Sequence, residues 1–265
     1  MSKLSVGVDD YVAMLRIGCE STRNAIDITI IRAIHSALDD LDHGKLKARA
    51  VVITGCNGVF CSGVDLHSVD LETEEARQRA HFDMRRFMDP LILRLSGFRY
   101  PIVAAVNGPA VGAGMSLALA SDIIVVAEGA YFCPSFARLG LVPDAGITFN
   151  LARRIGAGRS LATLMLAERI DAHAALAWGL AYAVAPAAEI AARAHDIARR
   201  LAVGPSAVLS SIRQLQSSSF NATLKDQLRA ELSAQATALQ SHDCIEGVAA
   251  FFEKREPHFL QAEKP

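Results

Sequence analysis

The stretch PIVAAVNGPAVGAGMS, residues 101–116, decides the fold of this chain. It opens with a continuous apolar run over residues 102–106, which is typical of a strand covered on both faces. A loop with three glycines follows, and residues 115–120 continue as an apolar helix. A strand, a loop and a helix in this order predict a right-handed crossover to the next strand of a parallel sheet.

The same alternation extends outward from this stretch. Apolar residues at helical spacing predict an amphipathic helix over residues 28–42. Short apolar runs predict strands at residues 11–17, 50–54 and 123–126, and a polar segment predicts one long helix over 72–95. We therefore expect an α/β fold with a parallel sheet.

The second half of the chain has a different composition. From about residue 147 it is rich in Ala and Leu, and this pattern predicts consecutive helices. The predicted helices cover residues 147–155, 158–167, 171–179, 187–203, 205–217, 223–241 and 244–255. Several are too apolar to face water on all sides, so we expect self-association.

Composition excludes several classes of protein. Hydrophobic residues make up 51% of the 265 residues and charged residues 21%, as in an ordinary globular chain. The net charge of −1 disfavours binding to nucleic acid. No apolar run reaches the roughly 18 residues of a membrane span, and the N-terminus lacks the apolar region of a signal peptide. The five cysteines include no CxxC pair, which favours a reduced, cytoplasmic protein without a disulfide framework or zinc site.

Two glycine-containing loops follow buried strands, and ligands of open α/β sheets bind at such strand ends. They are FCSGVDL at residues 60–66 and the loop over 107–116. A dinucleotide loop is disfavoured because Leu117 stands where GxGxxG needs a glycine. A nucleophile elbow is disfavoured because Ser116 lies ten residues beyond Val106. A tight turn that only packs a helix on the sheet remains open.

Several separated motifs, in order, resemble the crotonase family, the enoyl-CoA hydratase/isomerase superfamily. They are RNAI at residues 23–26, FCSGVDL at 60–66, PIVAAVNG at 101–108, ASDI at 120–123, LGLVPDAG at 139–146, AWGL at 177–180 and EGVAAFFEKR at 246–255. The resemblance implies a spiral of ββα units over residues 1–200 that holds an acyl-CoA site. It also implies a helical region over 201–265 that covers CoA and forms homotrimers or hexamers. It implies no cofactor, because the CoA thioester is the substrate.

The resemblance also implies roles for individual residues. The backbone N–H groups of Val64 and Ala113 are expected to bind the thioester oxygen, and a backbone donor survives alanine at the second position if φ is negative there. Lys254 is expected to reach the CoA phosphates across a subunit interface. Apart from the resemblance, Asp65 is expected to cap local N–H groups, because it stands two residues past Gly63. The residues expected to bind substrate are Arg23, Ala25, Ser62, Val64, Asp65, Leu66, Gly112, Ala113, Phe136 and Lys254.

The acid–base residues are expected to determine the reaction. Family hydratases use two glutamates, and the corresponding positions here are Ser116 and Phe136. One carboxylate remains at a position that related isomerases use, Asp144, and a single carboxylate suffices to move a double bond. The resemblance therefore favours an enoyl-CoA isomerase, including a ring-opened phenylacetyl-CoA isomerase. Enoyl-CoA hydration, a non-catalytic acyl-CoA binder, and hydrolysis or dehalogenation through Asp144 stay open as alternatives.

Overall fold

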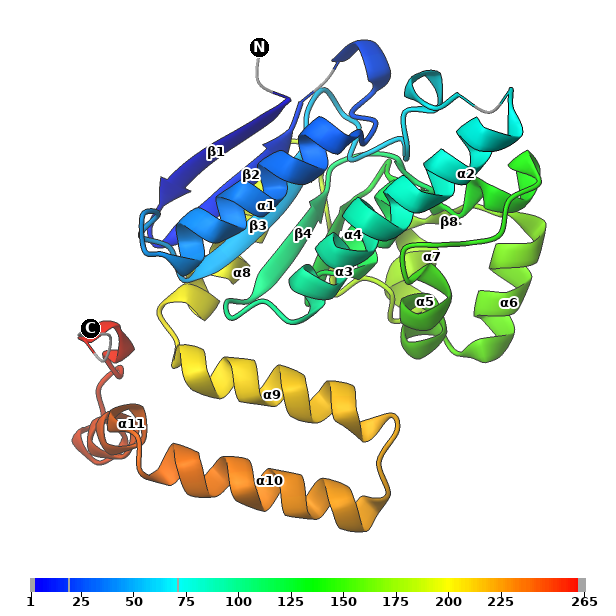
Figure 1. The fold of residues 1–265 in the computed structure, drawn as a ribbon. Coiled ribbons are helices and arrows are strands. Elements are labelled where there is room, and N and C mark those ends of the chain that lie inside the picture. The colour runs from blue at the N-terminus through cyan, green and yellow to red at the C-terminus, as the bar shows by residue number, and fades with distance from the viewer. Residues whose placement is uncertain (1–2, 19, 71, 262–265) are drawn as a thin grey trace.

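The computed structural model describes residues 3–18, 20–70 and 72–261. Its main sheet has six strands in the order β1-β2-β3-β4-β6-β9 (Figure 1). Their bounds are Leu4–Asp9 for β1, Val12–Ile17 for β2, Ala50–Gly55 for β3, Ile102–Val106 for β4, Ile123–Ala127 for β6 and Ala183–Ala185 for β9. All neighbours pair in parallel except β1 and β2. The expected parallel sheet is therefore correct for β2 onward and wrong at the β1 edge.

The β1–β2 hairpin corrects the expectation that a strand begins at Tyr11. Asp10 and Tyr11 both have positive φ, 44° and 62°, as the two central residues of a type I′ turn do. Type I′ turns usually contain asparagine or glycine at these positions. Asp10 and Tyr11 stand there instead, so the turn could not be recognised from its residues. Five of the six β1 residues are exposed, which is why their apolar pattern is weak.

A second, smaller sheet of three strands stands beside the first, in the order β5-β7-β8. Its strands are Ala110–Val111 for β5, Tyr131–Cys133 for β7 and Ile170–Asp171 for β8. Strands of two or three residues are too short to show periodicity, so sequence patterning did not predict them. Their importance is positional, because β5 lies inside the loop that follows β4.

Helices cover both faces of the main sheet. Figure 1 shows α1 in front of the strands and α8 behind them, and α8 packs on β3 and β4. The helices up to α8 are Ile28–Asp42 for α1, Glu74–Asp83 for α2, Asp89–Ser96 for α3, Ala113–Leu119 for α4, Ile147–Ile155 for α5, Ala157–Leu166 for α6, Ala172–Ala177 for α7 and Ile190–Ala202 for α8. Short helical turns occur at Glu20–Thr22 (η1), Leu66–Ser68 (η2), Ser135–Leu139 (η4) and Phe259–Gln261 (η5).

The long helix expected over residues 72–95 is three pieces. Between α2 and α3 lies η3, a π-helical turn over Met84–Met88. Pro90 stands in the first turn of α3, where its missing N–H has no effect on that helix. The same proline cannot donate to a carbonyl one turn earlier, so the α-helical ladder is interrupted there.

The last three helices form an arm that lies apart from the sheet (Figure 1). They are Ser206–Ser219 for α9, Leu224–Leu239 for α10 and His242–Glu253 for α11. Arg213 anchors α9 to the core, with its Nε 2.6 Å from Asp122 Oδ1 and its Nη2 donating to Tyr100 O at 3.0 Å. Neither α9 nor α10 buries a residue within the single chain.

No helix in the described part of the chain has the length and apolar character needed to span a membrane. Cys56, Cys61, Cys133 and Cys244 are free thiols, and Cys19 lies outside the described residues.

Candidate functional site

The two glycine-containing loops pack against each other through their backbones. Pro109 O accepts hydrogen bonds from the N–H groups of Phe60 and Cys61, both at 3.1 Å, and Val111 N–H donates to Cys61 O at 2.9 Å. A Cβ on Gly114 would lie only 2.4 Å from Cys61 O. A side chain there would separate the loops, so this approach requires glycine.

Gly63 brings the amide of Ala113 close to the FCSGVDL loop. Its φ of +98° favours glycine, and a Cβ on it would lie 3.0 Å from Val111 O and 3.7 Å from Ala113 N. Val64 directly follows Gly63, so the backbone amides of Val64 and Ala113 are near neighbours. Ala113 is the first residue of α4, where the N–H has no intrahelical acceptor.

The residue before each of these two amides has a hydrogen-bond partner for its own N–H group. Gly63 N–H donates to Cys61 Sγ at 3.4 Å, and Gly112 N–H donates to Cys133 O at 2.9 Å. Among loop and turn hydrogen bonds of the described residues, none is donated by Val64 or Ala113. Ala113 is not among the residues with positive φ. An alanine with negative φ can keep the backbone geometry of a hydrogen-bond donor, as was required above for this position. No loop or turn hydrogen bond among the described residues therefore occupies either N–H group.

Gly112 and Phe136 shape the surroundings of the second amide. Gly112 has φ 52° and ψ −123°, a conformation that side chains disfavour. A Cβ on Gly112 would lie 4.0 Å from Phe136 Cζ and 3.5 Å from Ser135 Oγ. Phe136 is buried, and Phe132 is fully buried on β7. An aromatic surface therefore stands beside the amide of Ala113.

Asp144 lies in the turn before α5 and is joined to α4. The hydroxyl of Ser116, fully buried one turn beyond Ala113, donates to Asp144 O at 3.3 Å and lies 3.5 Å from Gly112 O. Ser116 thus links the 144 turn to the helix that begins at Ala113. This bond was not expected from the sequence, because Ser116 and Asp144 are 28 residues apart.

The Asp144 carboxyl has a raised pKa, about 6 against an ordinary value of 3.8. Burial is the largest cause, the negative charge of Asp89 is the second, and a backbone hydrogen bond opposes both. Water still reaches the residue, which is exposed in the single chain. The raised pKa and the exposure are compatible if protein atoms surround the Asp144 side chain closely on one side and water reaches it on the other. We therefore expect water to reduce the rise in the pKa of Asp144.

The remaining residues with expected binding roles lie around the first loop. Arg23 is exposed and has a left-handed φ of 53°, whereas Ala25 is buried. Ser62 Oγ donates to Thr22 O at 3.0 Å, which connects the loop to the residue directly before the RNAI segment. Leu66 is 50% exposed, so an apolar surface is open to a ligand beside this loop.

Asp65 and Lys254 are placed differently from the rest. Asp65 caps η2 by accepting from His67 N–H at 3.1 Å, so its expected capping of local N–H groups is confirmed. Lys254 ends α11 and is exposed. Figure 1 shows α11 well away from α4, so the single chain does not bring Lys254 to the other site residues.

Ser116 and Phe136 supply no carboxylate, whereas Asp89 is a carboxylate near Asp144 that the sequence did not indicate. The Asp89-Pro90 pair could have signalled the start of a helix, although not its partner. Among the described residues, no group of three or more His, Cys, Asp or Glu side chains could hold a metal ion.

The fold and these loops define a mixed α/β protein in which two glycine-containing loops meet at the start of α4, and in which Ser116 of α4 is hydrogen-bonded to the backbone of the Asp144 turn. The model of the enoyl-CoA hydratase/isomerase family matches residues 9–262. The chain therefore belongs to that family, the crotonase superfamily, and is an acyl-CoA enzyme of hydratase/isomerase type.

Individual relatives agree with this assignment. The chain is 34% identical over 257 residues to a Rhodobacter capsulatus protein named "Probable enoyl-CoA hydratase", covering 95% of both. It is 37% identical over 211 residues to the 1,2-epoxyphenylacetyl-CoA isomerase of Escherichia coli, covering 80% of both. The crystal structure of an enoyl-CoA hydratase from Polaromonas sp. JS666 has a TM-score of 0.89 at 32% identity, covering 96% of this chain and 98% of that one.

Proposed function

We propose that this protein is an enoyl-CoA isomerase in which Asp144 moves a proton along the acyl chain. The observation that carries the proposal is the pair of residues at the hydratase glutamate positions. Ser116 and Phe136 stand there. Of the positions at which the family places an acid–base carboxylate, only position 144 therefore has one in this chain. Its raised pKa, about 6, suits a group that must both accept and return a proton near neutral pH.

The reaction begins with a 3-enoyl-CoA whose thioester oxygen accepts hydrogen bonds from Val64 N–H and Ala113 N–H. The Asp144 carboxylate takes a proton from the carbon next to the carbonyl, and the electron pair moves into a dienolate with negative charge on the oxygen. Asp144 then returns the proton two carbons further along, which gives the 2-enoyl-CoA. Atoms and electrons balance without a cofactor. Preorganised amides lower the barrier because they strengthen their bonds as charge develops on the oxygen.

Phe136 supports this reaction over hydration. A buried aromatic side chain beside the oxyanion amides leaves no group that would hold and deprotonate water at that position. The relative named 1,2-epoxyphenylacetyl-CoA isomerase supports a ring-derived acyl group as an alternative isomerase substrate. Hydration remains the second candidate function, because another relative is named an enoyl-CoA hydratase.

Two assays separate these functions. We expect purified protein to convert 3-enoyl-CoA to 2-enoyl-CoA, and to hydrate crotonyl-CoA far more slowly, with hydration followed at the ultraviolet band of the conjugated thioester. Asp144→Ala is the control for both, since it removes the proposed base. Equal isomerisation by wild type and this variant would exclude the proposed mechanism, and fast hydration without isomerisation would favour the hydratase.

We also propose that the arm assembles the protein into a homotrimer or hexamer. An open, apolar groove of about 470 Å³ between α9 and α10 supports this proposal. Leu228 and Leu232 line the groove and are 55% and 72% exposed in the single chain. A second copy that covers this groove would remove that apolar surface from water. Contact between copies would also give Lys254 a route to a neighbouring site.

The Leu228→Glu, Leu232→Glu double variant tests this assembly. Two carboxylates in the groove would have to be desolvated on association, so we expect the molar mass from light scattering to fall to that of one chain. Ser233→Glu is the matched control, because Ser233 is exposed on α10 and does not line the groove. An unchanged mass for the double variant would show that the groove is not the interface.

A further inference from the structure

The turn that carries Asp144 has a backbone conformation that its own residues disfavour. Ala145 and Gly146, which follow Asp144, have φ values of 49° and 73°. Glycine adopts such values freely, whereas an alanine in the left-handed region is strained. Ala145 is nevertheless buried, at 4% exposure. Contacts with the rest of the chain must therefore hold this turn in place.

One such contact is apolar and comes from α3. A Cβ on Gly146 would lie 3.5 Å from Ile92 Cγ2, and Ile92 is buried at 7% exposure. The side chain of Ile92 therefore packs directly on the turn. This contact limits how closely the turn approaches α3, but it fixes no direction, because apolar contacts are not directional.

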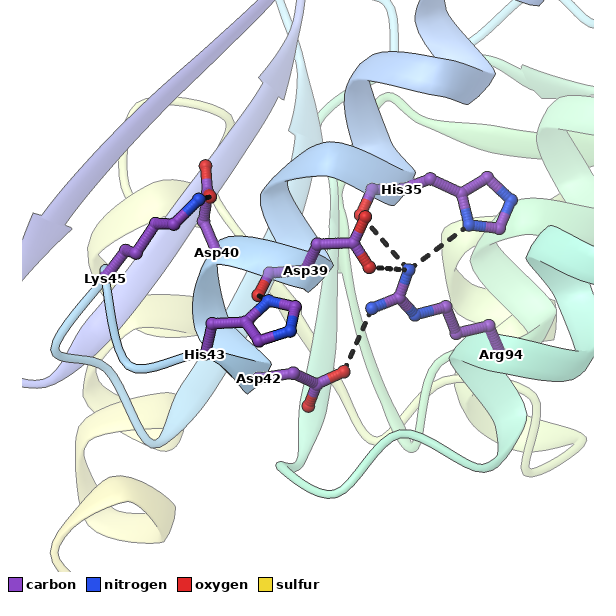
Figure 2. A network of polar contacts seen from close by, with 7 residues as sticks. All are labelled: His35, Asp39, Asp40, Asp42, His43, Lys45 and Arg94. Carbon is purple, nitrogen blue, oxygen red and sulfur yellow. Dashed lines mark hydrogen bonds and ion pairs between the residues drawn. The ribbon is translucent and has the colours of Figure 1, made fainter.

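Helix α3 is itself fixed to α1 by an ion-pair network. Figure 2 shows Arg94 of α3 pointing toward α1, where its Nη1 lies 2.8 Å from Asp39 Oδ1 and its Nη2 lies 2.9 Å from Asp42 Oδ2. Arg94 Nη1 also donates to His35 O at 3.2 Å. The apolar side of the turn therefore rests on a helix that is anchored to the core.

The polar contact of the turn comes from Ser116 of α4. Its hydroxyl is fully buried and donates to the main-chain oxygen of Asp144 at 3.3 Å. The other acceptor within reach, Gly112 O, is farther away at 3.5 Å and already accepts the N–H of Ser116 at 3.1 Å. Asp144 O also accepts Ile147 N–H at 3.1 Å, where α5 begins. The hydroxyl of Ser116 is thus bonded to Asp144 itself and not only to a neighbour.

Helix α4 is firmly placed against the FCSGVDL loop. A Cβ on Gly114 would lie only 2.4 Å from Cys61 O, so the two backbones are in close contact. Ser116 stands three residues beyond Ala113, whose N–H is a proposed donor to the thioester oxygen. The bond from Ser116 to Asp144 therefore joins the proposed base to the helix that carries this donor.

We propose that Ser116 is a positioning residue for isomerisation: its hydroxyl, bonded to the main-chain oxygen of Asp144, sets the carboxyl group of that residue relative to the amide of Ala113. The inference rests on the proposed function, in which Asp144 moves the substrate proton. Ser116 acts through Asp144 and exchanges no proton with the substrate. Proton transfer requires the base within hydrogen-bond reach of the carbon-bound proton, and a displacement of about 1 Å can slow such a step by about 100-fold.

The hold of Ser116 on the turn is measured by hydrogen–deuterium exchange with mass spectrometry. Ser116→Ala removes the hydroxyl and preserves α4, because alanine is the best helix former. We expect peptides over residues 144–150, which contain the Ile147 amide, to exchange about three- to tenfold faster, the usual effect of one hydrogen bond. Peptides over residues 28–42 should exchange at the wild-type rate, since only a loss of global stability would accelerate both segments.

Steady-state kinetics with a 3-enoyl-CoA measure the effect on the reaction. We expect kcat to fall by about tenfold in Ser116→Ala and KM to stay within about twofold of wild type. In an Asp144→Asn background the same substitution should change the residual rate by less than about twofold, because a residue that acts through the Asp144 carboxylate then has no base to position. A merely structural loss would lower both rates by the same factor.

Ser121→Ala is the matched control. Ser121 is buried at 3% exposure two residues beyond α4, and its hydroxyl has no hydrogen-bond partner among the described residues. It should keep the wild-type exchange and kcat.

Wild-type exchange over residues 144–150 in Ser116→Ala would overturn the inference, whether or not the protein isomerises its substrate. An active isomerase whose kcat Ser116→Ala leaves unchanged would also overturn it and would leave the proposed function intact. Faster exchange in a protein without isomerase activity would support the hold of Ser116 on the turn and count against the proposed function alone.

Discussion

Replacing Asp144 by asparagine is expected to lower kcat for double-bond migration by about 100- to 10,000-fold, the usual contribution of a general acid–base group. Asparagine has nearly the same shape and can keep the turn before α5, but it cannot accept the substrate proton. KM should change little, because in the proposed function the backbone amides of Val64 and Ala113, and not Asp144, hold the thioester. The measurement is a steady-state assay with a 3-enoyl-CoA, with wild type at the same pH as reference.

The same substitution is expected to raise the melting temperature at neutral pH. Burial, and then the charge of Asp89, raise the pKa of Asp144 from 3.8 to about 6 in the folded chain. The unfolded chain therefore loses this proton first, and stability falls as pH rises from about 4 to about 6 and stays lower above that. Because Asp144 is exposed, water screens part of this penalty, so we expect a small gain at pH 7.5 and none at pH 3.5.

Asp196→Asn, which removes an exposed aspartate on α8, is the control for both measurements. It should leave kcat unchanged and should not reproduce the pH-dependent gain in Tm. An Asp144→Asn protein with more than half of the wild-type kcat would rule out the carboxylate as the proton carrier, whatever happens to its stability.

The second large effect is expected from Gly63→Ala. The new methyl group would stand 3.0 Å from Val111 O and 3.7 Å from Ala113 N, on a residue whose φ of +98° already disfavours alanine. Either response, a shift of the loop or a change in φ, moves the amide of Val64 relative to that of Ala113. Loss of one oxyanion donor corresponds to about 100- to 1,000-fold in kcat. Thermal unfolding should show that most of the variant is still folded at the assay temperature.

Gly129→Ala is the matched control for that substitution. A methyl group on Gly129 would meet no atom within 4 Å, and this glycine does not have positive φ, so the same chemical change is harmless there. If folded Gly63→Ala retained full activity, the paired amides would not be the groups that stabilise the developing negative charge.

Much of the secondary structure was predictable because it follows local periodicity. The helix predicted over residues 28–42 has those bounds, and its N-cap, Asp27, accepts from Ile30 N–H at 2.9 Å. The strand predicted over 50–54 extends by one residue to Gly55. The break at η3 was missed although Pro90 marks it, since the polar residues around it continue a helical composition.

The two glycine-containing turns were predictable from the sequence, because glycine adopts the backbone conformations of Gly63 and Gly112 without strain, whereas their expected oxyanion role came from the family resemblance. The sequence by itself determined these turns, the α/β order of elements, and the lack of a carboxylate at positions 116 and 136. Only the tertiary structure decided what surrounds Asp144. Its hydrogen bond to Ser116 and its repulsion from Asp89 join segments 28 and 55 residues apart, and proton affinity depends on such distant charges and on burial rather than on neighbours along the chain.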